Sequence, residues 1–112
     1  MTKIIFYLGE EKEPTEISFG ENTSCVITEE YRITNIDPYF EHVVMVTAST
    51  KQIETALVSL YRDGVLNSLS DITMVKIQED EKEDEIFEGY DLKRIILNVT
   101  KAGNILSIIL NS

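Results

Sequence analysis

The segment from Ser49 to Gly64 constrains the fold of this chain most, because it is the one window of helical periodicity among segments with strand character. Its apolar residues recur at spacings of three and four, the pattern of one stripe along a helix: Ile53, Ala56, Leu57, Leu60 and Tyr61. Ser49 or Thr50 can cap the start, and Gly64 can end the helix in the left-handed conformation. The sequence therefore predicts a helix over residues 50–63 with this stripe packed on a sheet.

Most of the remaining chain has the alternation and the β-branched composition of strands. We expect strands over residues 1–8, 16–19, 24–36, 40–47 and 72–78, with a break at Asp37-Pro38. One helix in a β-rich chain indicates an α+β fold, in which a mainly antiparallel β-sheet or small β-sandwich of about six to eight strands carries the packed helix. A length of 112 residues is typical of one domain, so we assign residues 1–112 to a single α+β domain.

The clearest strand pattern is a C-terminal β-hairpin. Residues 92–100 and 105–110 are rich in β-forming side chains, and the turn sequence from Lys101 to Asn104 separates them. An even loop length puts the main apolar residues of both strands on one face: Ile95, Leu97, Val99, Leu106, Ile108 and Leu110. The opposite face still holds Ile96, Ile105 and Ile109. We expect the helix, a second sheet or another subunit to cover this second apolar face.

The negative charge is concentrated in two short segments. The net charge is −10, with six acids and one base in residues 79–85 and four acids and one base in residues 10–16. No basic stripe exists that could bind phosphates, so we expect no nucleic-acid partner. The acidic run at 79–85 is predicted to be a solvated loop that keeps the sheet soluble. The alternative is a DNA mimic, but a mimic needs carboxylates spread over a face rather than gathered in loops.

No constellation of residues for catalysis occurs in the sequence. Cys25 is the only cysteine, which excludes an intrachain disulfide, and His42 is the only histidine. We predict that Cys25 is a small buried apolar residue and that His42 lies at the edge or end of a strand, neither with a catalytic role. The acidic run has Lys82 where an EF-hand needs an oxygen ligand. No phosphate loop, nucleophile elbow or metal cluster occurs. The chain is therefore predicted not to be an enzyme and to have no catalytic, cofactor-binding or metal-binding residues, no cofactor and no small-molecule substrate.

The hydropathy pattern gives no sign of a membrane or secretion segment. No apolar run approaches the roughly eighteen residues that span a bilayer. The start of the chain, residues 1–8, lacks the longer apolar region and the cleavage site of a signal peptide. We therefore expect a cytoplasmic protein without a membrane partner.

The order of elements in the last seventy or so residues resembles that of small structural and tail-associated proteins encoded by phages and prophages of Gram-positive bacteria. The resemblance follows the helix over residues 51–63, the strand over residues 72–77, the acidic loop, and the segment from Phe87 to Leu92 that leads into the terminal hairpin. It implies a non-enzymatic virion or virion-assembly component that works by self-association, virion-associated in location. It brings no site residues to carry over.

These observations favour a structural or assembly protein that acts through protein–protein contacts, as a homo-oligomer or with a protein partner. The first alternative is an acidic inhibitor or DNA mimic that binds a nucleic-acid-binding protein of a host. The second alternative is a small ligand-binding module or enzyme, for which the sequence offers no supporting motif.

Overall fold

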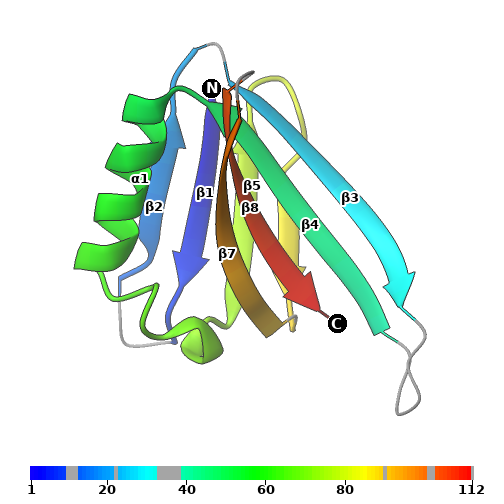
Figure 1. The fold of residues 1–112 in the computed structure, drawn as a ribbon. Coiled ribbons are helices and arrows are strands. Elements are labelled where there is room, and N and C mark those ends of the chain that lie inside the picture. The colour runs from blue at the N-terminus through cyan, green and yellow to red at the C-terminus, as the bar shows by residue number, and fades with distance from the viewer. Residues whose placement is uncertain (10–12, 22, 33–38, 90, 101–102, 112) are drawn as a thin grey trace.

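A computed structural model describes residues 1–9, 13–21, 23–32, 39–89, 91–100 and 103–111. These residues form two antiparallel four-stranded sheets stacked as a β-sandwich (Figure 1). One sheet, named the β1 sheet, contains β1 (Thr2–Tyr7), β2 (Thr15–Phe19), β5 (Met74–Glu79) and β6 (Glu85–Glu88) in the order β2-β1-β5-β6. The other, named the β4 sheet, contains β3 (Ser24–Arg32), β4 (Tyr39–Ala48), β7 (Asp91–Thr100) and β8 (Gly103–Asn111) in the order β3-β4-β8-β7. The predicted α+β class is confirmed.

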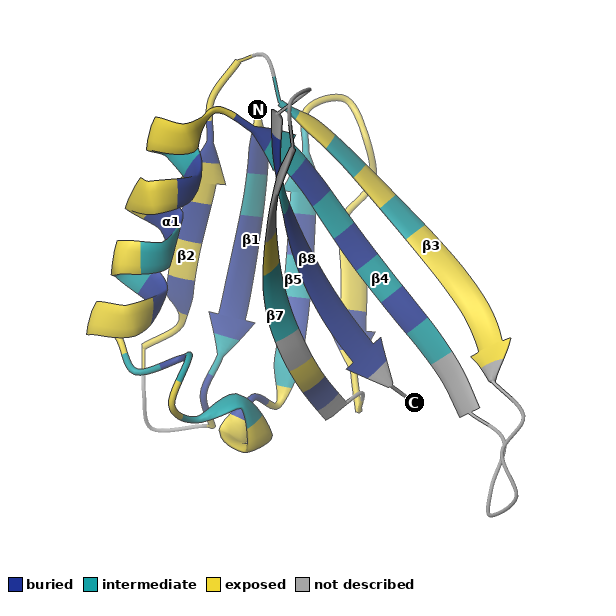
Figure 2. Ribbon diagram, in the orientation of Figure 1, coloured by how far each residue is buried: buried dark blue, intermediate teal, exposed yellow. Residues whose placement is uncertain are grey.

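The hydrophobic core lies between the facing sides of the two sheets. Strand alternation sends every second side chain inward, and Figure 2 shows the resulting change between buried and less buried residues along β4. The best buried side chains come from both sheets: Ile4, Phe6, Ile17, Phe19 and Ile77 from the β1 sheet, and Val44, Val46, Leu106, Ile108 and Leu110 from the β4 sheet. Each sheet therefore covers the apolar inner face of the other, as in other aligned sandwiches.

The helix α1 (Thr50–Arg62) lies alongside β2 and touches the start of β8 (Figure 1). Its start is fixed by a capping box, in which the Ser49 hydroxyl accepts from the Gln52 backbone N–H at 3.3 Å and the Gln52 side chain accepts from the Ser49 backbone N–H at 3.0 Å. Ile53, Ala56 and Leu60 are buried. The helix thus closes one side of the sandwich, whereas the second sheet covers the large inner face.

The predicted helix stripe is wrong at one position. Leu57 is half-buried, but Tyr61 is 69% exposed. Because α1 packs against the narrow side of the sandwich and not on a broad sheet face, only the centre of the stripe is enclosed. Gly64, with φ +79°, follows the helix in the left-handed conformation, as expected.

Most predicted strands are confirmed within two residues of their ends. The break at Asp37-Pro38 and the last residues of the segment expected to extend to residue 36 lie outside the described part of the chain. Two short elements were not predicted, the strand β6 and a 3-10 turn over Leu69–Asp71. In β6, acidic residues flank the apolar pair Ile86 and Phe87, so its extended conformation depends on pairing with β5.

The C-terminal hairpin is confirmed, and so is the prediction that an even number of loop residues sets the apolar residues of its two strands on one face. Ile95 pairs with Ile108 and Leu97 with Leu106, as an even loop length requires. Thr100 pairs with Gly103, so β8 begins earlier than expected and the connecting residues 101–102 lie outside the described ranges. The ladder shifts between Leu92 and Arg94, which leaves Lys93 in a bulge.

Candidate functional site

The outer face of the β4 sheet is the most distinctive surface of the described structure. Alternation places six apolar side chains on this face, away from the core: Val26 from β3, Val43 and Met45 from β4, Ile96 from β7, and Ile105 and Ile109 from β8. Figure 1 shows the β4 sheet in front of the β1 sheet, with no other drawn helix or strand stacked on this side. No described helix or strand stacks on this face, yet its side chains shield one another: Val26 is 49% exposed, Ile109 is buried, and the other four are half-buried.

The outer face of the β1 sheet has a different character. Lys3 on β1 forms an ion pair with Glu16 on β2 at 3.0 Å, and Lys76 on β5 lies 3.5 Å from the carboxylate of Asp84. The Gln78 side chain donates to the same Asp84 carboxylate at 3.3 Å. Charged and amide side chains on this face meet water or one another. The same face also carries the apolar residues Ile5 and Ile86, of which Ile86 is 54% exposed, so it is mixed in character, whereas the outer face of the β4 sheet is apolar across all four strands.

His42 lies inside the sandwich, which corrects its predicted place at the edge or end of a strand. It belongs to β4, which has β3 on one side and β8 on the other. Its Nδ1 atom is 4.0 Å from a carboxylate oxygen of Glu29, and its ring centre is 5.2 Å from that of Phe87. His42 therefore joins the two sheets through an aromatic contact with β6 and pairs with the carboxylate of Glu29 only when protonated.

Cys25 is half-buried and not fully buried as predicted. It lines a hollow of about 280 Å³ between β3 and the β5–β6 connection, together with Ile27, Glu79, Lys82, Glu83 and Glu85. Burial, with a smaller contribution from the charge of Glu79, raises the pKa of the Cys25 thiol from 9.0 to about 11, and Lys82 acts in the opposite direction. The thiol is thus protonated at neutral pH and a poor nucleophile.

Cys25 and His42 share the inner face but do not form a catalytic pair. Cys25 is opposite Val46, whereas His42 is opposite Glu29, four residues further along β3. At a rise of about 3.3 Å per residue, the two side chains are about 13 Å apart along the strands. This separation exceeds the reach of a thiol–imidazole hydrogen bond several-fold.

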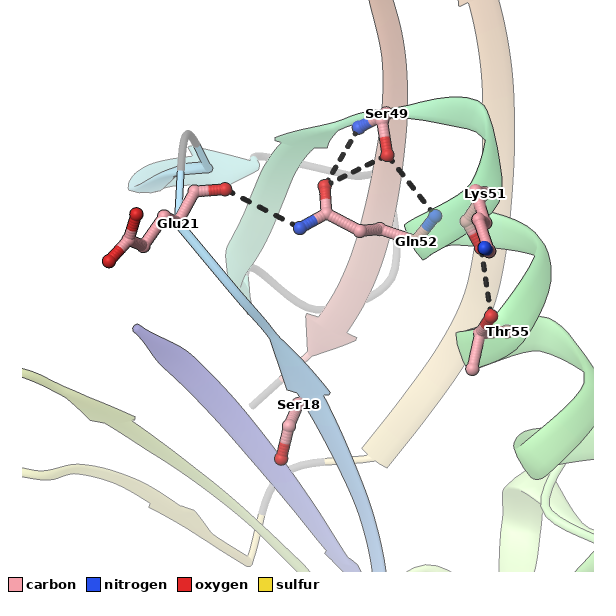
Figure 3. Close-up of a pocket in the computed structure, with 6 residues that line it drawn as sticks. All are labelled: Ser18, Glu21, Ser49, Lys51, Gln52 and Thr55. Carbon is pink, nitrogen blue, oxygen red and sulfur yellow. Dashed lines mark hydrogen bonds between the residues drawn. The ribbon is translucent and has the colours of Figure 1, made fainter.

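A hollow of about 460 Å³ lies at the start of α1 (Figure 3). Its lining is polar: Ser18, Glu21, Ser49, Lys51, Gln52 and Thr55. Most of these groups serve the helix itself, since Ser49 and Gln52 form the capping box and the Thr55 hydroxyl donates to the Lys51 carbonyl at 2.9 Å. Gln52 also donates to the Glu21 carbonyl at 3.4 Å. The hollow brings no nucleophile and base together.

The prediction of an exposed acidic loop is confirmed for residues 80–84, whereas the two ends of the run belong to strands. Glu79 ends β5 and Glu85 begins β6. The amino group of Met1 lies 2.6 Å from the Asp80 carboxylate, and Lys82 lies 3.4 Å from that of Glu79. No group of three or more potential metal ligands is found among the described residues.

No protein family, curated protein or solved structure matches this chain. Within the described ranges, no helix combines the length and the apolar character that crossing a membrane requires.

The sequence reasoning found Ile96, Ile105 and Ile109 but missed the rest of the apolar outer face. Val43 and Met45 alternate with the buried Val44 and Val46 in an unbroken apolar run. Such a run indicates a strand that is apolar on both faces, and it was the signal that could have located the remainder of this surface.

Proposed function

We propose that this protein is a non-enzymatic structural or assembly protein that associates with further copies of itself through the outer face of the β4 sheet. The observation that carries the proposal is the row of apolar side chains across all four strands of that sheet. The outer face of the β1 sheet, by contrast, carries ion pairs between its apolar residues, such as that of Lys3 with Glu16. An apolar face of this extent is typical of a protein interface.

The interface would resemble the core of the sandwich itself. Neighbouring strands lie about 4.8 Å apart, so the side chains of two facing sheets can interdigitate when the sheets are about 10 Å apart. The charged residues described on this side, Glu30 and Glu41, are near one end of the β3–β4 pair and leave its centre apolar. In its most specific form, suggested by the order of elements in the sequence, the protein is a component of a phage or prophage virion or tail.

The test uses a charge placed in the centre of the face. Met45→Lys puts an ammonium group where the partner sheet would pack, whereas Ile86→Lys places the same group on the outer side of β6, where an exposed apolar residue faces water. Light scattering coupled to size exclusion should show oligomers for the wild type and for Ile86→Lys. Met45→Lys should weaken association at least about tenfold, because a desolvated unpaired charge is costly.

Two results would contradict the proposal. One is a wild-type protein that stays monomeric at high concentration, and the other is a Met45→Lys variant that associates like the wild type. Circular dichroism on both variants shows whether each has kept its fold.

A further inference from the structure

The two edges of the β4 sheet are long, but only one is regular: β7 has a bulge at Lys93, and the 3-10 turn over Leu69–Asp71 contacts this strand near Leu92. β3, with nine residues, forms one edge, and β7, with ten, forms the other. The β3–β4 ladder runs without a register shift. Edge strands of soluble proteins are usually short, covered, kinked or interrupted by proline, because their unpaired backbone groups can pair with another chain. By contrast, β3 has neither a bulge nor a proline.

Both edge strands carry exposed apolar side chains, as α1 and β6 also do. Val26 and Tyr31 on β3 are 49% and 53% exposed, and Leu97 on β7 is 41% exposed. The edges of the β1 sheet are protected differently, by α1 beside β2 and by the short length of β6. In Figure 1, β3 and β7 are the outermost strands of the front sheet.

We infer that β3 of one copy pairs edge to edge with β7 of the next copy, so that the β4 sheets of successive copies become one continuous antiparallel sheet. This inference rests on the proposed self-association and names its geometry. All neighbours within the β4 sheet are antiparallel, so β3 and β7 run in opposite directions. A second copy placed beside the first in the same orientation therefore continues the antiparallel alternation without a break.

The register follows from which face each residue occupies. Ile27 and Leu97 both pair with core residues and point inward, whereas Thr28 and Ile96 both point outward. Pairing Ile27 with Leu97 of the next copy keeps every inward residue opposite another inward residue. The same register places position 24 opposite position 100 and position 30 opposite position 94, so residues 94–100 of β7 are paired, whereas the bulge at Lys93 and the 3-10 turn over Leu69–Asp71 lie beyond this stretch.

Charge favours a second copy as the occupant of the edge. β3 carries Glu29 and Glu30 near its end, and the corresponding part of β7 carries the exposed Lys93 in its bulge. In the register above, Glu30 lies next to Lys93 of the neighbouring copy. A β3 edge paired with a second β3 would instead bring carboxylates close together, which is unfavourable between adjacent strands.

The contact is head to tail, so each copy keeps one free edge after pairing with a neighbour. Such an assembly grows until it closes into a ring or continues as a filament, depending on the rotation between copies. It also joins the apolar outer faces of the β4 sheets into one extended surface. Edge pairing and face packing are therefore compatible and separately testable.

Engineered disulfides distinguish this arrangement from others. In a Cys25→Ser background, Thr28→Cys and Ile96→Cys combined in one chain place two thiols directly opposite each other between copies. Residues opposite each other in an antiparallel pair have Cα atoms about 4.5 to 5.5 Å apart, within the range of a disulfide. Mild oxidation should give a ladder of covalent dimers, trimers and larger species on non-reducing gels.

Single-cysteine variants and a variant with cysteines on opposite faces serve as controls for the crosslinking. Thr28→Cys alone and Ile96→Cys alone should stay monomeric on the gel, and Thr28→Cys with Leu97→Cys should crosslink weakly, because these two side chains point to opposite faces. Dimers from a single-cysteine variant, or an uncrosslinked double variant that still forms oligomers in light scattering, would overturn the edge pairing and leave the proposed function intact. A wild-type protein that stays monomeric at high concentration would overturn both.

Charge reversal gives an independent test. Glu30→Lys and Lys93→Glu should each weaken self-association about fivefold, because each replaces an attraction between adjacent strands by a repulsion. The double variant should associate like the wild type. Additive losses in the double variant would contradict the predicted register.

Discussion

Cys25 shows how the surroundings of one residue decide its chemistry. Its thiol, half-buried beside Glu79, has a pKa raised from 9.0 to about 11. A shift of two pH units lowers the thiolate fraction at pH 8 about 100-fold relative to a thiol of ordinary pKa. We therefore expect Cys25 in the folded protein to react with iodoacetamide about 100-fold more slowly than in the urea-unfolded chain at the same pH.

The same shift makes stability depend on pH in a definite direction. Between pH 9 and about 11 the unfolded chain loses the thiol proton while the folded protein keeps it, so folded stability falls as the pH rises through this window. A Cys25→Ser variant should lose this contribution. An alkylation rate equal to that of the unfolded chain would show that the thiol is neither desolvated nor close to Glu79.

Glu81 has an unfavourable backbone conformation. Its φ of 62° lies in the left-handed region, which is unfavourable for a residue with a Cβ atom by roughly 1 kcal/mol. Glu81→Gly relieves this strain and removes one acid from a crowded run, so we expect the free energy of unfolding to rise by about 0.5 kcal/mol. Glu83→Gly, with the same loss of charge at another exposed position of the run, should lower it. Urea denaturation of the two variants decides between these signs.

At the scale of elements, the start of α1 depends on one reciprocal pair of hydrogen bonds. Ser49→Ala removes the hydroxyl that accepts from the Gln52 backbone N–H. We expect the free energy of unfolding to fall by about 1 kcal/mol, the usual value of an N-cap residue. Thr55→Ala, in the exposed middle of the same helix, should have no destabilising effect, because alanine is the better helix former. Equal losses in both variants would show that the cap contributes nothing specific.

The elements that the sequence predicted well are those whose periodicity is local. The helix over residues 50–63, the first strand and the parity of the terminal hairpin all follow from side chains within about fifteen residues of one another. β6 was missed because its stability comes from pairing with β5. Tyr61 was wrongly placed in the core, because the apolar stripe of a helix does not show how much of that stripe the neighbouring sheet covers.

At the scale of the whole molecule, the sequence left open what covers each apolar face. The division into two sheets depends on which distant strands pair, such as β1 with β5, and no local pattern contains that information. For the same reason His42 could not be placed in the centre of a sheet, nor Cys25 beside Glu79. The candidate site was foreseen only in Ile96, Ile105 and Ile109, whose alternation already showed two apolar faces.

Net charge and the apolar surface oppose each other when copies of this protein associate. Two bodies of charge −10 with centres 28 Å apart, the shortest dimension of the molecule, repel by about 15 kcal/mol in unscreened water. Salt reduces this repulsion strongly, since the screening length is about 8 Å at physiological ionic strength. The attraction of one pair such as Glu30 and Lys93 contributes less than about 1 kcal/mol, so the repulsion governs the overall salt dependence.

We therefore expect self-association to strengthen as NaCl rises from about 50 mM to about 500 mM, several-fold in dissociation constant, measured by sedimentation or light scattering. Glu81→Gln combined with Glu83→Gln, both exposed, should raise association at low salt and change little at high salt. An acidic inhibitor bound to a basic partner would behave in the opposite way, because salt weakens attraction between opposite charges. Self-association that declines steadily with added salt would mean that charge, and not the apolar outer face of the β4 sheet, holds the copies together.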